Sequence, residues 1–260
     1  MLELSSVQYT YPRQDSPAVK DASLTVRERE VLAVIGRNAS GKSTLSKLAA
    51  GILTPERGVA TVDGLDTRDE RLGLEVRRRV AFLQQNPESQ FVSVTVEREI
   101  ASGPENLGFT AADTRAAVGD MLDFFGLVEL RKCPPSALSA GQMQKVLLAS
   151  LLAMKPAYLV LDEPTSYLDP IERDAVSREV KRISQSLGTS VVWVTQFLYE
   201  AAALPRIIAV ADGRVCFDGA VAGLQDDAAT LALLGIDITE LRQDSLGTPR
   251  LPGARSRCPR

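Results

Sequence analysis

The pattern of apolar and polar positions predicts a chain that alternates between strands and helices. Residues 2–11 and 22–27 alternate loosely between apolar and polar side chains, which predicts two antiparallel strands at the start. Residues 31–35 form a continuous apolar run, as expected of a strand that is buried on both faces of a parallel sheet. Apolar residues then recur at helical spacing over about residues 42–50, and Gly51 follows as a helix stop.

The middle of the chain has a different character. Over about residues 89–155 the apolar spacing is helical and strand signals are almost absent, so we expect a helical subdomain inserted into the sheet domain. A long helix is predicted over about residues 170–187. Apolar strand segments return at 157–161, 190–195 and 207–211. This alternation predicts an α/β core with a largely parallel sheet.

The end of the chain is poor in apolar residues. From Arg242 on, it contains three prolines, two glycines and five arginines. Because such a composition buries little apolar surface, we expect a mobile tail from about this residue.

Composition and charge exclude several classes of function. With 260 residues, of which 45% are hydrophobic, the chain can bury a core without metal or disulfide cross-links. Lys and Arg number 30 against 33 Asp and Glu, so the net charge of -3 offers no sequence-wide attraction to nucleic acid, and we expect no nucleic-acid partner. Histidine is absent, which excludes histidine general bases, Ser–His triads and histidine metal ligands.

The cysteines and the hydropathy pattern favour a cytoplasmic setting. Cys133, Cys216 and Cys258 lack CxxC spacing and resemble neither a zinc site nor a secreted disulfide framework. No apolar run approaches the roughly 20 residues that span a bilayer. The N-terminus also lacks the basic start and the apolar core of a signal peptide. We therefore expect neither export nor a membrane span.

The segment GRNASGKST at residues 36–44 matches the P-loop pattern G-x-x-x-x-G-K-[ST] between a predicted strand and a predicted helix. In such a loop, backbone N–H groups and the start of the helix surround phosphates. Lys42 is expected to reach the β- and γ-phosphates of ATP, Ser43 to bind Mg²⁺, and Thr44 to add a hydroxyl near the α-phosphate. Ala39 stands where glycine is common. The expected phosphate-binding residues are Gly36, Asn38, Ala39, Ser40, Gly41, Lys42, Ser43 and Thr44.

A second motif, AYLVLDEP at residues 157–164, is an apolar strand that ends in two carboxylates and a proline. This is the pattern of a Walker B strand. Asp162 is expected to hold Mg²⁺, and Glu163 to orient the attacking water. The alternative is that both are solvated loop carboxylates that cap the next turn.

The segment LSAGQ at residues 138–142 precedes the Walker B strand by about one helix. Together with the other motifs, it resembles the signature motif of the ABC-transporter ATPases, and the resemblance extends over about residues 2–225. The signature residues expected to bind nucleotide are Ser139, Gly141 and Gln142. Ser139 can cap the following helix, and Gly141 lets backbone N–H groups approach an anion. The alternative is that Ser139 is only an ordinary helix N-cap.

Further residues match the family in order along the chain. Gln85 resembles the Q-loop glutamine, which contacts Mg²⁺ and the water and lies near the membrane subunit. Tyr11 resembles the aromatic residue that stacks on adenine, although a core tyrosine at a strand end is the alternative. Asp169, in SYLD, resembles the D-loop aspartate at the dimer interface. Because Pro170 and Glu172 follow Asp169, this position is also a predicted helix start with capping-box spacing, and both interpretations can hold.

One family position differs. The family usually carries a histidine after the next strand, where it contacts the γ-phosphate, whereas this chain has Gln196 in WVTQF. An amide can donate a hydrogen bond but carries no positive charge, so we expect slower hydrolysis. The alternative is that Gln196 merely ends a strand and that another residue acts as the switch.

Two strings, QNPESQF at 85–91 and GPENLG at 103–108, resemble the energy-coupling-factor and cobalt-type import ATPases. Lys42 and Ser139 are too close in sequence for the long coiled coil of the ABC ATPases that maintain chromosomes. The chain also has one cassette, whereas the translation-factor ATPases of this superfamily have two.

The resemblance implies a P-loop NTPase with a RecA-like α/β core, an antiparallel β edge and an inserted helical subdomain. It implies an ABC ATPase domain over residues 1–225 and an extension over 226–260. As the family implies, two subunits sandwich two Mg-ATP molecules, either as a homodimer or with a paralogue. The two ATPase subunits would bind integral membrane subunits at the cytoplasmic face. Together these subunits would form an importer for a vitamin or a metal ion, which the ATPase subunits energise. The alternative function is a slowly hydrolysing subunit that supports an active paralogue.

Overall fold

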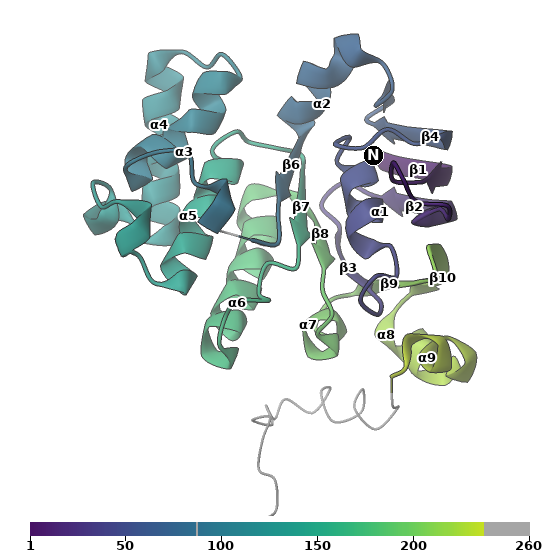
Figure 1. The fold of residues 1–260 in the computed structure, drawn as a ribbon. Coiled ribbons are helices and arrows are strands. Elements are labelled where there is room, and N and C mark those ends of the chain that lie inside the picture. Colours follow the sequence, from purple (N-terminus) through teal and green to yellow (C-terminus); the bar gives the residue numbers. More distant parts are fainter. Residues whose placement is uncertain (87, 237–260) are drawn as a thin grey trace, which may run out of the picture.

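The computed structural model describes residues 1–86 and 88–236, which form two sheets flanked by helices (Figure 1). The larger sheet has the strand order β10-β9-β3-β8-β7-β6, and its neighbouring strands are parallel except β10, which runs antiparallel to β9. Its strands are β3 (Val31–Ile35), β6 (Val80–Leu83), β7 (Tyr158–Asp162), β8 (Ser190–Val194), β9 (Arg206–Ala211) and β10 (Arg214–Gly219). The prediction of an α/β core with a largely parallel sheet is confirmed.

The smaller sheet is antiparallel and has the order β2-β1-β4-β5. Its strands are β1 (Leu2–Tyr9), β2 (Val19–Val26), β4 (Arg57–Val62) and β5 (Leu65–Asp66). In the first pair Leu2 lies opposite Val26, so the predicted antiparallel β edge is confirmed. Strand β2 begins at Val19, three residues before the predicted start at residue 22, and β4 and β5 were not predicted.

Helix α1 (Lys42–Ala49) packs in an apolar cluster with side chains from both sheets. Leu32 and Val34 of β3 belong to this cluster, whereas Ala33 and Ile35 belong to a second cluster that includes the helices on the other face. Strand β3 is therefore covered on both faces, which explains its unbroken apolar run.

Three helices, α3 (Val96–Asn106), α4 (Ala111–Phe125) and α5 (Ala140–Leu152), pack against one another on one side of the larger sheet (Figure 1). They lie within residues 89–155, where helical spacing was expected. The other helices are α2 (Gly73–Arg79), α6 (Pro170–Leu187), α7 (Leu198–Ala202), α8 (Val221–Asp226) and α9 (Ala228–Leu234), and short 3₁₀ segments span Glu70–Leu72, Glu88–Gln90, Val128–Leu130 and Pro135–Ala137. The division of the chain into domains at residue 225 stays a prediction.

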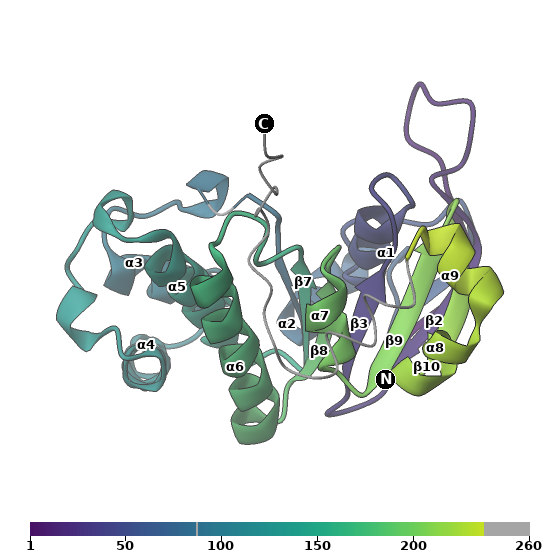
Figure 2. The ribbon, with the colours of Figure 1, turned by 90° about the horizontal axis from the view of Figure 1, so that it is seen from below.

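Seen from below, α6 and α7 lie beside the strands β7 and β8 (Figure 2). Among residues 1–86 and 88–236, no helix has the length and apolar character that crossing a bilayer requires. The tail expected to be mobile from Arg242 lies outside the described residues.

Candidate functional site

The loop between β3 and α1 bends so tightly that two positions require glycine. A Cβ atom on Gly36 would lie 2.2 Å from the carbonyl oxygen of Val210, and one on Gly41 would lie 2.5 Å from that of Ala18. Ala39 has a φ of 63°, in the left-handed region that glycine adopts most easily, which is consistent with the frequent glycine there. The loop therefore has the folded backbone that its sequence pattern predicted.

Lys42 lies inside this bend and is only 4% exposed. Its Nζ donates hydrogen bonds to the carbonyl oxygens of Gly36 at 2.8 Å and Arg37 at 2.9 Å. Burial lowers the pKa of Lys42, while the carboxylates of Glu163 and Asp162 oppose this shift. The ammonium group is thus held close to the loop backbone and faces two carboxylates.

A second buried polar group in the loop has no partner of its own. The side-chain hydroxyl of Ser40 makes no hydrogen bond within the described part of the chain, and Ser40 is 6% exposed. Because buried hydroxyls are normally paired, a ligand in the bend is the natural acceptor.

A hydrogen bond connects the end of the Walker B strand to the first turn of α1, which follows the loop. Ser43 Oγ donates a hydrogen bond to Asp162 Oδ1 at 2.9 Å, although the two residues are 119 positions apart in sequence. Burial raises the pKa of Asp162, and the hydrogen bond from Ser43 works in the opposite direction. A serine hydroxyl and a carboxylate are hard oxygen ligands, and Mg²⁺ commonly takes few protein ligands because it retains waters and phosphate oxygens. These residues therefore fit Mg²⁺.

Glu163 lies beside Asp162 and is held by two donors. Gln85 Nε2 donates to Glu163 Oε2 at 2.9 Å. The Ser166 hydroxyl is shared between that same oxygen at 3.0 Å and the Glu163 carbonyl oxygen at 2.8 Å. Both donors contact Oε2, which leaves Oε1 as the oxygen of Glu163 available to a ligand or a water. Glu163 has a φ of 49°, an uncommon backbone conformation for a non-glycine residue of the kind that recurs at functional sites.

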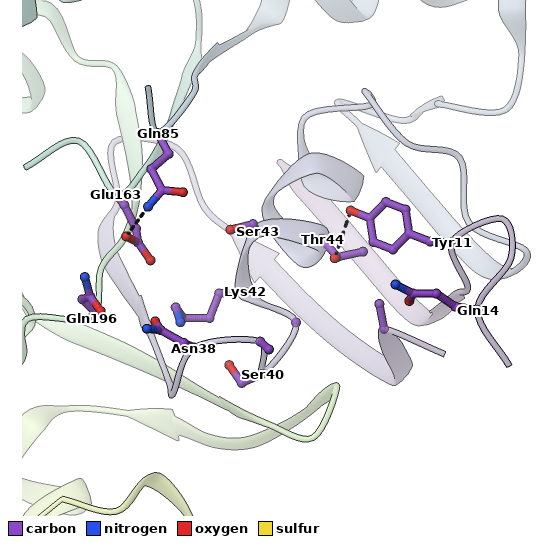
Figure 3. Close-up of a pocket in the computed structure, with 13 residues that line it drawn as sticks. Tyr11, Gln14, Asn38, Ser40, Lys42, Ser43, Thr44, Gln85, Glu163 and Gln196 are labelled. Atoms are coloured by element: carbon purple, nitrogen blue, oxygen red, sulfur yellow. Dashed lines mark hydrogen bonds between the residues drawn. The ribbon is translucent and has the colours of Figure 1, made fainter. Parts of the chain in front are cut away.

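At the other end of the cavity lies Tyr11 (Figure 3). Thr44 Oγ1 donates to the Tyr11 hydroxyl at 3.2 Å, and the Tyr9 ring packs edge-on against the Tyr11 ring at 5.0 Å between centroids. The Gln14 N–H donates to the Tyr11 carbonyl at 3.0 Å, closing a turn that brings the Gln14 side chain to the cavity. Gln14 was not predicted, because only the turn places it here; the turn residue Pro12 was the available signal.

These residues enclose a cavity of about 450 Å³. The loop, Gln85, Glu163 and Gln196 line one end of this cavity, and the turn that carries Tyr11 lines the other end (Figure 3). The lining residues are Tyr11, Gln14, Ala18, Asn38, Ala39, Ser40, Gly41, Lys42, Ser43, Thr44, Gln85, Glu163 and Gln196. Gln196 follows β8 and is exposed at the cavity, so the structure places it where a switch residue was expected.

The predicted signature residues do not line this cavity. Ser139 caps α5 and forms a capping box with Gln142, as its alternative interpretation predicted. The Gly141 N–H donates to Glu172 Oε1 at 3.2 Å, so an anion does approach this backbone, but it is a carboxylate of the same chain.

Asp169 also lies away from the cavity lining, at the start of α6. Its side chain accepts a hydrogen bond from the Glu172 N–H at 2.9 Å, so the predicted helix start at Pro170 is confirmed. The Glu172 carboxylate extends to Gly141 of α5. Glu172 therefore links the starts of two helices.

Comparison with known proteins identifies the family. The model of the family described as "ABC transporter" matches residues 19–166, which is more than half of the chain. The chain belongs to the ABC-transporter family. It is accordingly an ATPase, and the segment with the P-loop pattern, residues 36–44, lies within the matched residues.

Relatives of this ABC ATPase extend the match over most of its length. It is 41% identical to an energy-coupling factor transporter ATP-binding protein EcfA1 of Symbiobacterium thermophilum, over 89% of this chain and 83% of the relative. It is 36% identical to a cobalt import ATP-binding protein CbiO of Syntrophus aciditrophicus, over 96% of this chain and 85% of the relative. The resemblance to the energy-coupling-factor and cobalt-type ATPases is thus confirmed.

Solved structures share the ABC ATPase fold. CbiO1 of Clostridium perfringens, described as part of the ABC transporter complex CbiONQ, has a TM-score of 0.79 at 26% identity, over 94% of this chain and 97% of that chain. A dimeric post-hydrolysis state of the ATP-binding cassette MJ0796, bound to ADP and Pi, has a TM-score of 0.75 at 25% identity, over 85% and 98%. The expected P-loop NTPase fold is confirmed.

Proposed function

We propose that this ABC ATPase binds Mg-ATP in the 450 Å³ cavity and hydrolyses it to energise an importer of the energy-coupling-factor type. The observation that carries the proposal is that Lys42, Ser43 and the Gln85–Glu163 pair line one cavity, with Asp162 hydrogen-bonded to Ser43. These groups come from three separate chain segments, and together they are what phosphoryl transfer from a nucleotide needs.

The phosphates lie in the bend of the P-loop in this proposal. Lys42 exchanges its contacts with the Gly36 and Arg37 carbonyls for contacts with the β- and γ-phosphates, and the unpaired Ser40 hydroxyl gains a phosphate oxygen as acceptor. Ser43 and Asp162 would hold Mg²⁺, which would supply positive charge against the phosphates. Thr44 is close to the α-phosphate, and Tyr11 stacks on adenine.

Hydrolysis requires a water that is positioned for attack. Glu163 Oε1 is the acceptor for that water, since Gln85 and Ser166 already occupy Oε2. A carboxylate fixed in this way keeps its orientation without help from the ligand, which is the preorganisation that general-base catalysis needs. Gln85, by bonding Glu163, links this carboxylate to the segment that follows β6.

We include in the proposal a dimer in which two subunits enclose the nucleotides, because the predicted signature and D-loop residues do not line this chain's own cavity. Ser139, Gly141, Gln142 and Asp169 do not line it, so in this proposal they complete the cavity of a partner subunit instead. The Gly141 N–H would then exchange Glu172 for the partner's γ-phosphate. The relatives' names, an energy-coupling factor transporter ATP-binding protein and a cobalt import ATP-binding protein, support an importer. We extend the proposal to integral membrane subunits that this chain contacts at the cytoplasmic face, and to a vitamin or a metal ion as cargo.

A second candidate function is a slowly hydrolysing subunit that supports an active paralogue. The observation that favours it is Gln196, which lines the cavity together with Glu163 in a chain without histidine. A neutral amide there offers a hydrogen bond but no charge.

The experiment compares Lys42→Ala with Lys181→Ala, which removes an exposed lysine of α6 remote from the cavity. We expect Lys42→Ala to weaken Mg-ATP binding by about 10-fold or more, because it removes charge-assisted contacts to phosphate. Lys181→Ala should bind as the wild type does. Equal affinity and turnover in all three proteins would contradict the P-loop assignment. Purifying the chain from detergent-solubilised membranes tests the importer, which requires co-purifying integral membrane subunits.

A further inference from the structure

A buried carboxylate behind the cavity connects the two segments that carry Glu163 and Gln196. Glu200 lies on α7 and is 3% exposed. Its Oε1 accepts a hydrogen bond from Thr165 Oγ1 at 2.7 Å, and its Oε2 accepts one from Thr195 Oγ1 at 2.5 Å. Both threonines are almost fully buried. One carboxylate therefore accepts from two hydroxyls in the segments that follow the neighbouring strands β7 and β8.

Each threonine is close in sequence to a residue that lines the cavity. Thr165 is two positions after Glu163, and Thr195 immediately precedes Gln196. Thr195 Oγ1 also accepts a hydrogen bond from the Phe197 N–H at 3.0 Å, which fixes the backbone on the far side of Gln196. The position of the Gln196 backbone thus depends on Thr195, and that of Thr195 depends on Glu200.

Arg173 of α6 also contacts both segments, the one after β7 and the one after β8. Its Nε donates to the Leu168 carbonyl at 2.8 Å, and its guanidinium lies 3.9 Å from the centroid of the Phe197 ring. The Tyr199 hydroxyl donates to Glu200 Oε1 at 3.5 Å. Burial raises the pKa of Glu200, whereas the two threonine hydroxyls and Arg173 favour its charged form. A carboxylate buried with several donors is costly to lose, because each donor is left unpaired.

We propose that Glu200 is a positioning residue that fixes the separation of Glu163 and Gln196 across the site where the γ-phosphate reacts. This inference rests on the proposed function. Glu200 does not line the cavity, so it acts through the two threonines and not by contact with nucleotide. It is expected to govern turnover and to leave nucleotide binding unchanged, since the P-loop and Tyr11 hold the nucleotide.

The test compares Glu200→Ala and Glu200→Gln in the full chain, purified with its accompanying ATPase and membrane subunits. Glu200→Ala frees both threonines, and a small displacement of reacting groups costs up to about 100-fold, so kcat should fall by about 10- to 100-fold with little change in the KM for ATP. Glu200→Gln should restore most of kcat, because its amide oxygen can accept from Thr195 and its amide nitrogen can donate to Thr165.

The matched control is Glu30→Ala. Glu30 is a half-buried carboxylate that accepts hydrogen bonds from the Arg27 N–H and from Arg206, at the end of β3 remote from the P-loop. This variant should lose stability while its kcat stays at the wild-type value. If Glu200→Ala also shows wild-type kcat, Glu200 is merely structural and the inference is overturned.

A second measurement covers the case in which Glu200→Ala does not fold. Thr195→Val removes the hydroxyl that contacts both Glu200 and the Phe197 N–H. It should also lower kcat with little change in KM. In a Gln196→Ala background the effect of Thr195→Val should largely disappear, because both changes act on one group. Full additivity would overturn the inference. An inactive wild-type complex would instead contradict the proposed function itself.

Discussion

Replacing Glu163 by glutamine separates the chemical step from folding and binding. The two donors to Glu163, Gln85 Nε2 and Ser166 Oγ, both contact Oε2. A glutamine whose amide oxygen takes the place of Oε2 keeps both hydrogen bonds. Its NH₂ group then occupies the position of Oε1, the oxygen that we assign to the attacking water. The substitution therefore changes the reactive atom and preserves the contacts that hold it.

The effect on stability should be small because opposing contributions offset each other. Each hydrogen bond to Glu163 loses its charge-assisted part, which costs about 1 kcal/mol. The attraction between Glu163 and the Lys42 ammonium is lost as well. Against these losses, Glu163→Gln removes the repulsion between Glu163 and Asp162, which contributes to the raised pKa of Asp162. We expect the melting temperature to change by no more than about 4 °C.

The effect on turnover should be large. Loss of a positioned general base costs about 10²- to 10⁴-fold, so kcat should fall by this factor while Mg-ATP affinity is retained. ATP should then hold the subunits together, and gel filtration with ATP should show a persistent dimer. Glu179→Gln, a change on the outer part of α6 where Glu179 pairs with Arg182, serves as the control and should hydrolyse ATP as the wild type does. A Glu163→Gln protein that binds ATP and keeps more than about a tenth of wild-type kcat would refute the assignment of Glu163 as the base.

Three further predictions concern Gln196, Asp162 and Tyr11. Gln196→His should raise kcat with little change in KM, by up to the roughly 10²- to 10³-fold that one donor to a developing charge supplies, and equal steady-state rates for the two proteins, alone and with any co-purifying ATPase, would contradict it. Asp162→Asn should raise the melting temperature of the nucleotide-free protein near neutral pH, because the raised pKa of Asp162 means that its ionised form opposes folding. This gain in melting temperature should vanish as the pH falls below 3.8, the ordinary pKa of an aspartate. A gain that persists at that pH would contradict the assigned cause. Tyr11→Ala should weaken ATP binding by about 5- to 150-fold, because it removes a stacking interaction worth about 1–3 kcal/mol. Tyr11→Phe loses only the contact with Thr44 and should bind ATP nearly as the wild type does. Calorimetric titration of both variants decides whether the ring or the hydroxyl of Tyr11 matters.

The sequence by itself determined the features that depend on short, continuous segments. The P-loop, the Walker B strand and the start of α6 were each identified correctly, because glycine at a tight bend, apolar residues in a buried strand, and Asp169 before Pro170 act locally. The helical spacing of residues 111–125 likewise matched α4. In contrast, β4, β5, β6 and β10 were missed, since these strands are short or only partly buried and their identity comes from pairing with distant strands.

Only the tertiary structure decided how the site is held together. Gln85 and Glu163 are 78 positions apart and meet through one hydrogen bond, which no periodicity indicates. Glu200 resembles an ordinary helical carboxylate in sequence, yet the packing of α7 behind the cavity buries it between two threonines. The residues assigned to the signature from their motif do not belong to this chain's own cavity lining. Local rules specify which groups are available, and long-range packing specifies which of them meet, because contacts between distant segments depend on how sheets and helices pack and not on sequence spacing.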